Sequence, residues 1–402
     1  MQGMRRAGSR FALRCKTAMD SETILPATHS ATGFGGLFAT VYRVLDDAIA
    51  ARAFPGCAFG VLELDKSGGE IVLQDARGRY TYEDDSPAVT SETVYDVASL
   101  TKVVATTAAA MLLWQRGQLD LETPLSELLP EFVAGRAPAD PARRITLRNL
   151  LAHNSGLPSY VEFFRTVRTP QAVLRACLKL PLEADPGARA EYSDPGFILL
   201  GKALEASTGE SLDAWVGREV LQPLGMTATG FSPRREARSS IPPTEEDATL
   251  RRRRIQGRIQ GQVQDENARL LGGVAGHAGV FSKVPDLLRF ARQMLPARSG
   301  SGESGLFKTA TVEVFAQRQS PEGSSRALGW DTPSEKSSSG RYFSSHSIGH
   351  LGFSGCSLWI DLDAAVAVAL LTNRTWPDRQ NLAIRQLRPA FHNAVREALQ
   401  LR

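Results

Sequence analysis

Residues 97–117, VASLTKVVATTAAAMLLWQRG, contain the sequence pattern that says most about this chain. Between Val103 and Trp114 it holds no helix breaker, and apolar residues fall on every face, which predicts a buried helix. Gly117 is placed to end that helix. Ser99 would lie at its start, where free backbone N–H groups and the helix dipole favour a developing negative charge.

Ser99 and Lys102 form an S-x-x-K pattern. Residues three apart share one face of a helix, about 5–6 Å from each other at Cβ. Burial disfavours the charged form of a lysine, so we expect the pKa of Lys102 to be lowered towards that of a base. A serine beside such a base can act as a nucleophile. The pattern alone is weak, because a serine at a helix start with a lysine one turn later also occurs in structural helices.

Length and composition are those of an ordinary globular protein. The 402 residues are 42% hydrophobic, enough for a large core and for two lobes. The formal net charge of +4 points neither to nucleic acid nor to an acidic membrane. The cysteines are widely scattered, with no C-x-x-C and no Cys/His cluster, so we expect free thiols rather than a zinc site or a disulfide framework. They are Cys15, Cys57, Cys177 and Cys356.

The first 20 residues are basic, but their longest apolar run is Phe11-Ala12-Leu13, far short of the core of a secretion signal. No stretch approaches the 18 apolar residues of a membrane span. As written, the sequence predicts a cytoplasmic protein, and a misassigned start would leave a periplasmic location open. Residues 1–33 are expected to be a disordered leader.

Strand-like segments near both ends of the chain flank a helical middle. A predicted helix over 37–54 precedes two predicted strands, about 57–64 and 70–76, and the spacing from about 118 to 225 is almost entirely helical. Further strand-like runs and a closing helix occupy 345–350, 356–361, 364–372 and about 378–399. We therefore expect an α/β (α+β) fold with a sheet lobe, in which the two ends of the chain meet, and an all-helical lobe.

Two segments of unusual composition lie between these parts. Residues 232–268 are polar and contain Arg251–Arg254; no aromatic residues interleave, so we favour a solvated insertion over a nucleic-acid or phosphate patch. Residues 270–281, LLGGVAGHAGVF, match neither phosphate-loop pattern, and their glycines predict close approach of backbone. His277 in this segment is a candidate lining residue of a cleft.

A tyrosine could handle protons beside Ser99. Tyr192 precedes a predicted helix in which Pro195 takes the first position and Asp194 is a candidate cap. A tyrosine held near Lys102 would have its phenolate favoured and could serve as a base. One tyrosine of seven is equally a core residue when taken alone.

A glycine-rich turn, HLGFSG at 350–355, follows the first of the late predicted strands. A backbone N–H at such a turn could point at a carbonyl oxygen, as in an oxyanion hole, and Gly352 would permit close approach. His350 itself fits a structural histidine as well as a functional one.

In chain order, S-x-x-K, HNSGLP at 153–158, Y-S-D at 192–194 and HLGFSG resemble the serine β-lactamase and penicillin-binding-protein superfamily. The likeness is to the branch around class C β-lactamases, D-alanyl-D-alanine carboxypeptidases and related esterases. ITLRNLLAHNSGLP (145–158) is similar to its helix-and-turn signature, and LGGVAGHAGVFSKVPDLLRF (271–290) is similar to its glycine-rich segment. The resemblance covers about residues 37–400.

The resemblance implies a β-lactamase/transpeptidase-like fold, with a central antiparallel sheet lobe flanked by helices plus an all-helical lobe. It implies one hydrolase domain over 34–402. Its expected parts are a sheet lobe at about 37–98 and 284–402, a helical lobe at about 99–283 and the polar insertion at about 232–268.

The resemblance also implies roles for single residues. Ser99 would be the acylated nucleophile, and Lys102 and Tyr192 would share the general acid/base work. The backbone N–H groups of Ser99 and Phe353 would form the oxyanion hole. His350 matches the position at which many relatives carry the lysine of a K-T-G triplet. No metal or organic cofactor is implied.

The departures from the family pattern bear on the substrate. The K-T-G triplet reads His350-Leu351-Gly352, so the lysine and threonine that help to hold a β-lactam carboxylate are absent. Asp194 replaces the usual asparagine, an acceptor-only group in place of an amide donor. It is equally a candidate for substrate contact and for a structural cap. We expect an esterase or a D-amino-acid peptidase or carboxypeptidase acting on small-molecule esters, amides or peptides.

The sequence also fits other functions. Within the family they are a weak class C-type β-lactamase and a catalytically idle scaffold protein. A Ser/His/Asp hydrolase with His350 as its base is an enzymatic rival, although G-x-S-x-G does not occur in the chain. No nucleic-acid partner and no membrane span are expected, and the oligomeric state stays open.

Overall fold

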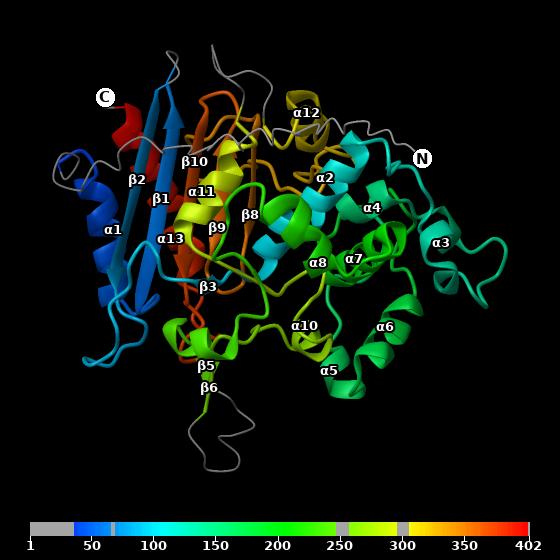
Figure 1. The fold of residues 1–402 in the computed structure, drawn as a ribbon. Coiled ribbons are helices and arrows are strands. Elements are labelled where there is room, and N and C mark those ends of the chain that lie inside the picture. The colour runs from blue at the N-terminus through cyan, green and yellow to red at the C-terminus, as the bar shows by residue number, and fades with distance from the viewer. Residues whose placement is uncertain (1–35, 66–68, 247–256, 296–304, 401–402) are drawn as a thin grey trace, which may run out of the picture.

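The computed structural model describes residues 36–65, 69–246, 257–295 and 305–400. Its centre is a five-stranded antiparallel sheet with the strand order β2-β1-β10-β9-β8 (Figure 1). The strands are β1 (Gly56–Leu64), β2 (Glu70–Gly78), β8 (Ser347–Leu351), β9 (Ser357–Asp361) and β10 (Val366–Thr372). Because β1 pairs with β10, the early and late parts of the chain meet in one sheet, as the sequence predicted.

Helices cover both faces of this sheet. Side chains alternate between the two faces along a strand. On β1, Phe59 and Val61 pack with α1 (Ala39–Ala50) and α13 (Ile384–Gln400). Ala58 and Leu62 face the other way, into the larger core that α11 (Val284–Arg292) helps to form. The sheet therefore lies between two apolar layers, and the larger one continues into the helical half of the molecule.

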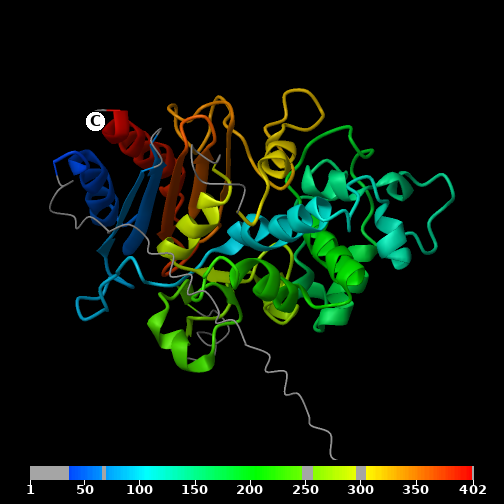
Figure 2. The ribbon, with the colours of Figure 1, turned by 45° about the horizontal axis from the view of Figure 1, so that its top comes forward.

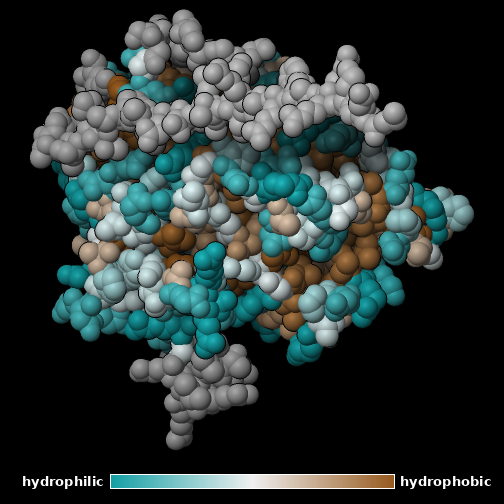
Figure 3. All heavy atoms as spheres, in the orientation of Figure 1, coloured by the Kyte–Doolittle hydropathy of each residue, from teal (hydrophilic) through white to brown (hydrophobic). Residues whose placement is uncertain are grey.

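The helical half lies beside the β8 edge of the sheet, and the turned view shows α2 running into it from the sheet (Figure 2). Its helices are α2 (Ala108–Gln115), α3 (Leu125–Leu128), α4 (Leu147–Leu151), α5 (Phe163–Thr166), α6 (Pro170–Leu178), α7 (Asp194–Thr208) and α8 (Leu212–Val216). On the face drawn in Figure 3, hydrophobic residues gather over α7 and α8.

Short elements connect the two halves. Three strands form a small sheet with the order β3-β7-β4: β3 (Tyr95–Asp96), β7 (Val280–Ser282) and β4 (Gly230–Phe231). A second small pair is β5 (Glu245–Glu246) with β6 (Arg258–Ile259). The remaining helices are α10 (Glu266–Leu270) and α12 (Thr309–Ala316). Because β3 leads directly into residues 97–102, this small sheet positions the S-x-x-K segment.

The predicted buried helix is present, with an irregular start. A 3₁₀ turn at Ala98–Leu100 and a π-helical segment at Lys102–Thr107 precede α2. Every residue from Lys102 to Leu113 is buried, and Gly117, in the left-handed region with φ +67°, follows the end of α2 as predicted. π-Helical turns are rare and occur frequently at functional sites.

Several sequence expectations concern residues outside the described ranges. The predicted leader at 1–33, Cys15 and the run Arg251–Arg254 fall there. The three cysteines within the described residues are buried free thiols, as expected. Among the helices described, none has both the length and the apolar character needed to cross a membrane.

Candidate active site

The residue before Ser99 has a strained backbone. Ala98 has φ +48°, a region that non-glycine residues rarely adopt and that costs on the order of 1–3 kcal/mol. Two hydrogen bonds hold it there: the Ala98 N–H donates to Asp96 Oδ1 at 2.9 Å, and Thr101 Oγ1 donates to the Ala98 carbonyl at 2.6 Å. The turn leaves Ser99 partly exposed between two buried neighbours.

The buried Asp96 carboxyl group ties this turn to a distant segment. Besides Ala98, it accepts a hydrogen bond from the backbone N–H of Gln264 at 2.7 Å. Burial raises the pKa of Asp96 to about 6. On the other side of the turn, the Val280 N–H donates to Thr101 Oγ1 at 3.0 Å. The Ser99 turn is therefore fixed from two segments that are far away in sequence.

Lys102 lies at the centre of the site with a side chain that has no exposed surface. Its Nζ donates to Ser99 Oγ at 3.2 Å, to Asp194 Oδ1 at 2.7 Å and to the His277 carbonyl oxygen at 3.0 Å. An ammonium group has three N–H donors, so these contacts use all of them. The serine and the lysine of the S-x-x-K pattern are thus in direct contact.

The expected lowering of the Lys102 pKa is wrong. Burial does lower it, but the charge of Asp194 and the nearby Tyr192 outweigh burial, and the pKa is raised above its ordinary value. Lys102 is therefore protonated in the free protein. The sequence could not reveal this, because Asp194 lies 92 residues further along the chain.

Tyr192 joins Ser99 and Lys102. Its ring centre lies 4.7 Å from Lys102 Nζ, and the neighbouring Lys102 and Ser99 side chains both act to lower the pKa of its hydroxyl group. Burial raises the pKa of Tyr192, and the charge of Lys102 only partly offsets this. The predicted proximity is confirmed, and the Lys102 charge does favour the phenolate as expected, but burial outweighs it, so the Tyr192 pKa stays raised.

Asp194 is not the cap of α7, contrary to one of the two expectations for it. Ser193 takes that position: its Oγ accepts the Gly196 N–H at 3.1 Å and donates to the Pro158 carbonyl at 2.7 Å. The Asp194 carboxylate is consequently free to pair with Lys102 at 2.7 Å.

His153 contributes to the site, although sequence reasoning gave it no role. It has φ +54°, and its Nδ1 accepts the backbone N–H of Ser193 at 3.0 Å. Its ring lies between those of Tyr192 and Phe197, with centroids 4.7 and 4.8 Å away. Burial, followed by the charge of Arg326, holds the pKa of His153 well below its usual range. A neutral His153 therefore packs against the Tyr192 ring and helps to position it. In the sequence, the HNSGLP motif at 153–158 was the feature that could have pointed to this residue.

His350 is buried and neutral. Its Nδ1 lies 2.9 Å from the Leu351 carbonyl oxygen, so this nitrogen carries the proton and donates. Burial, then the charges of Lys102 and Arg326, keep the pKa of His350 well below its ordinary value. Its Nε2 has no hydrogen-bond partner within the described residues. His350 therefore supplies no positive charge where the family resemblance places a lysine.

Gly352 brings the end of β8 against the Ser99 turn. A Cβ atom at this position would lie 2.4 Å from the Val97 carbonyl oxygen, so only glycine fits. The next residue, Phe353, is 49% exposed, and the Arg374 guanidinium lies 4.4 Å from its ring centre. The turn predicted to carry the oxyanion hole thus adjoins the predicted nucleophile.

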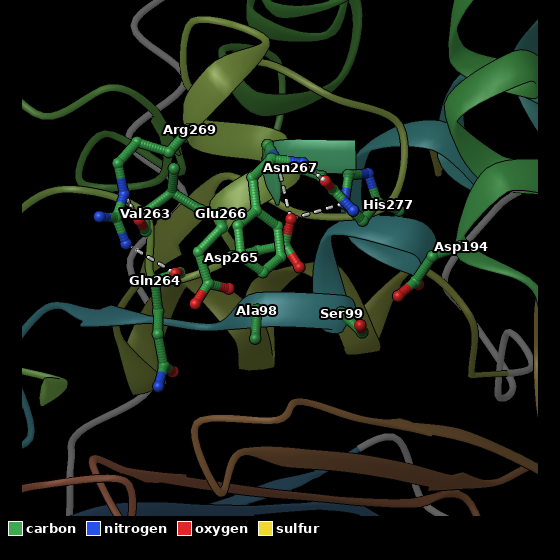
Figure 4. A network of polar contacts seen from close by, with 12 residues as sticks. Ala98, Ser99, Asp194, Val263, Gln264, Asp265, Glu266, Asn267, Arg269 and His277 are labelled. Atoms are coloured by element: carbon green, nitrogen blue, oxygen red, sulfur yellow. Dashed lines mark hydrogen bonds and ion pairs between the residues drawn. The ribbon is translucent and has the colours of Figure 1, made fainter. Parts of the chain in front are cut away.

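His277 lies behind the site rather than on an open cleft wall. Its side chain is 1% exposed, and its Nε2 is 2.9 Å from Asp265 Oδ1 (Figure 4). Burial disfavours the negative charge of the Asp265 carboxylate, but the His277 contact outweighs burial and lowers the pKa of Asp265 to about 2. Asp265 also caps α10 by accepting the Ala268 N–H at 2.7 Å. The pair anchors the segment whose His277 carbonyl accepts from Lys102.

Comparisons with known proteins place the chain in a family. The family named Beta-lactamase matches residues 41–390. A Salmonella agona (strain SL483) protein named as a D-alanyl-D-alanine carboxypeptidase is 31% identical over 332 residues, covering 76% of this chain and 76% of that relative. The N-acetylmuramyl-L-alanine amidase of Bacillus subtilis (strain 168) is 31% identical over 362 residues, covering 83% of this chain and 80% of the relative.

Solved structures share the fold at lower identity. The hydrolase EstCE1, described as having promiscuous acyltransferase activity, has a TM-score of 0.69 and 24% identity, covering 90% of this chain and 100% of its own. The octameric penicillin-binding protein homologue from Pyrococcus abyssi has a TM-score of 0.63 and 19% identity, with 87% and 76% covered. These likenesses confirm the predicted β-lactamase/transpeptidase-like fold. The family match and the two relatives at 31% identity show that this chain belongs to the β-lactamase family and is a serine hydrolase.

Proposed function

We propose that Ser99 is the acylated nucleophile of this hydrolase and that Lys102 and Tyr192 move its proton. The observation that supports this most directly is the contact of Lys102 Nζ with Ser99 Oγ at 3.2 Å, inside a buried site that also holds the Tyr192 hydroxyl group. The substrate class that fits is a small amide or ester, with a D-amino-acid peptide as the leading case. Both relatives reported above have names that place an amide bond at alanine.

In the free protein Lys102 is protonated and Tyr192 is neutral, so the proposed reaction begins when this pair releases one proton to solvent, which leaves the Tyr192 phenolate beside the Lys102 ammonium group. Ser99 Oγ then attacks the substrate carbonyl carbon while its proton passes to Tyr192. The backbone N–H groups of Ser99 and Phe353 stabilise the oxyanion. Tyr192 returns the proton to the leaving amine or alcohol, which departs and leaves an acyl-ester on Ser99. Water hydrolyses that ester by the same proton path.

Intact-protein mass spectrometry tests this proposal. The protein is incubated separately with a fluorescent penicillin, a p-nitrophenyl ester and a D-Ala-D-Ala peptide, and any adduct is located by peptide mapping. We expect an acyl adduct on Ser99 with the ester and release of D-alanine from the peptide. A long-lived penicillin adduct would add penicillin recognition to these activities. An adduct on another residue, or no adduct and no turnover with any reagent, would overturn the proposal.

Asp194→Asn is expected to shift the pH dependence of kcat/KM to lower pH. Asp194 keeps Lys102 protonated, because its negative charge raises the lysine pKa against the effect of burial. Without that charge burial prevails, so Lys102 loses its proton at a lower pH. The ascending limb of a pH–rate profile should move down by about 1–3 pH units. Thermal melting of both proteins checks folding, and an unmoved limb would show that Asp194 does not control the proton.

Asp265→Asn is expected to lower kcat about 10-fold with little change in KM, by loosening the hold on His277 and on its carbonyl oxygen, which accepts from Lys102. Glu266→Gln is a matched control, because Glu266 is adjacent on α10 but pairs with Arg379. Steady-state kinetics on one ester substrate compare the two variants. Equal losses in both would point to a general disturbance of α10 instead.

A further inference from the structure

One guanidinium group beside the candidate active site has unused hydrogen-bonding capacity. The Arg326 guanidinium carbon lies 5.4 Å from the centre of the Tyr192 ring, and the side chain is 24% exposed. The Arg326 guanidinium group donates no hydrogen bond to any residue within the described ranges. It does form an ion pair with Asp331, but the 3.7 Å between Nη1 and Oδ1 is too long for a hydrogen bond. One oxygen of Asp331 already accepts from Ser325 Oγ at 2.7 Å.

The fold brings Arg326 to this place. Asp331 forms an antiparallel bridge with Gly349 of β8 and another with Arg326. The turn that carries Arg326 therefore runs along the edge of β8, next to His350. The Arg326 charge is among the causes that lower the pKa of His153 and His350, which line the Tyr192 ring.

Other arginines of this half of the molecule, unlike Arg326, donate several hydrogen bonds each. Arg374 donates to the backbone carbonyls of residues 353, 379 and 381, and Arg388 donates to those of residues 352, 355 and 356. Arg379 pairs with Glu245 and Glu266. Lys102 is likewise neutralised by Asp194. Arg326 is thus a positive group at the site that can still take a ligand.

We propose that Arg326 binds a carboxylate on the leaving group of the substrate. A guanidinium group is a planar fork of N–H donors that matches a carboxylate in two parallel hydrogen bonds. The position beside Tyr192 fits the leaving-group side, because Tyr192 is the residue proposed to protonate that group. In an amino-acid leaving group, only Cα separates the amide nitrogen from the carboxylate. With His350 neutral, Arg326 supplies the positive charge for this contact.

The proposal rests on the proposed function and narrows its substrate class. It selects acyl-amino acids and peptides with a free C-terminal carboxylate over neutral esters. A carboxypeptidase-type reaction follows: the acyl part stays on Ser99, and the released amino acid carries away its carboxylate and the proton delivered by Tyr192.

Binding and turnover are measured with one matched pair of ligands. These are an N-acetylated D-Ala-D-Ala peptide with a free carboxylate and the same peptide with a C-terminal amide. Titration calorimetry uses Ser99→Ala protein, which removes the proposed nucleophile, so binding is seen without requiring turnover. We expect the peptide acid to bind Ser99→Ala protein about 10- to 100-fold more tightly than the peptide amide. In the double variant Ser99→Ala/Arg326→Gln, the two peptides should bind with equal affinity. Arg326→Lys should restore part of the preference for the acid.

Arg144→Gln is the control, because Arg144 is 66% exposed and pairs with Asp185 at the surface. It should keep the acid-to-amide ratio of the parent. A parent that binds acid and amide equally, or an Arg326→Gln protein that keeps the preference, would overturn the proposal for Arg326. Failure of the proposed function is a separate result: wild-type protein would then hydrolyse neither peptide nor p-nitrophenyl ester, whatever the binding ratio.

Discussion

Replacing Ser99 with alanine is expected to lower kcat on the order of 10⁶-fold, the scale seen when a serine hydrolase loses its nucleophile. Among the described residues, Ser99 is the one serine or threonine whose hydroxyl group accepts a hydrogen bond from Lys102 Nζ; the other acceptors are the Asp194 carboxylate and the His277 carbonyl oxygen. The measurement is single-turnover kinetics with a p-nitrophenyl ester, followed by mass spectrometry for the acyl adduct.

The Ser99→Ala protein should fold normally. The substitution removes one hydrogen bond of 3.2 Å, and the charge of Lys102 keeps its partner Asp194. The strained turn does not depend on the hydroxyl group either, because its bonds come from Asp96 and Thr101. A melting temperature close to that of the wild type is therefore part of the expected result. An adduct of wild-type mass on the alanine variant would exclude Ser99 as the nucleophile.

Local patterns in the sequence predicted the parts of this site that depend on short-range order. The apolar run after Lys102 indicated a buried helix, and the three-residue spacing predicted the contact between Ser99 and Lys102. The strand-like runs at both ends predicted a shared sheet. Each follows from periodicity or spacing, which a sequence displays directly.

The protonation of the site could not be predicted in this way. The Lys102 pKa depends on Asp194, which approaches it only when α7 packs beside the Ser99 turn. The same packing gives the cap position to Ser193, which was one residue away from the expected cap. At His153 the strained backbone lies beside a hydrogen bond from the distant Ser193 N–H. At Ala98 the bonds come from the nearby Asp96 and Thr101, whose side chains are in turn held by the distant backbone N–H groups of Gln264 and Val280. Electrostatics and strain are properties of the assembled site.

Lys102→Met is expected to lower kcat/KM by about 10²–10⁴-fold, the usual contribution of a positioned acid or base. It should also destabilise the fold, because it leaves the Asp194 carboxylate, whose side chain is 15% exposed, without its counter-charge. Breaking a buried ion pair from one side costs about 3–5 kcal/mol. Chemical denaturation measures the loss of folding stability, and steady-state kinetics measures the loss of kcat/KM.

The double variant Lys102→Met/Asp194→Asn separates charge balance from proton transfer. Removing both charges should restore most of the stability, since a buried pair replaced as a whole is often neutral for folding. Activity should stay at the level of the single variant, because Tyr192 would still lack the amine with which it is proposed to share the acid/base work. Recovery of activity in the double variant would show that Lys102 acts only by neutralising Asp194. The His350→Gln variant tests the rival mechanism, in which His350 is the base that activates Ser99. That mechanism predicts a larger loss of kcat/KM in His350→Gln than in Lys102→Met. The contact of Lys102 Nζ with Ser99 Oγ predicts the larger loss in Lys102→Met, since His350 Nδ1 is instead bonded to the Leu351 carbonyl oxygen.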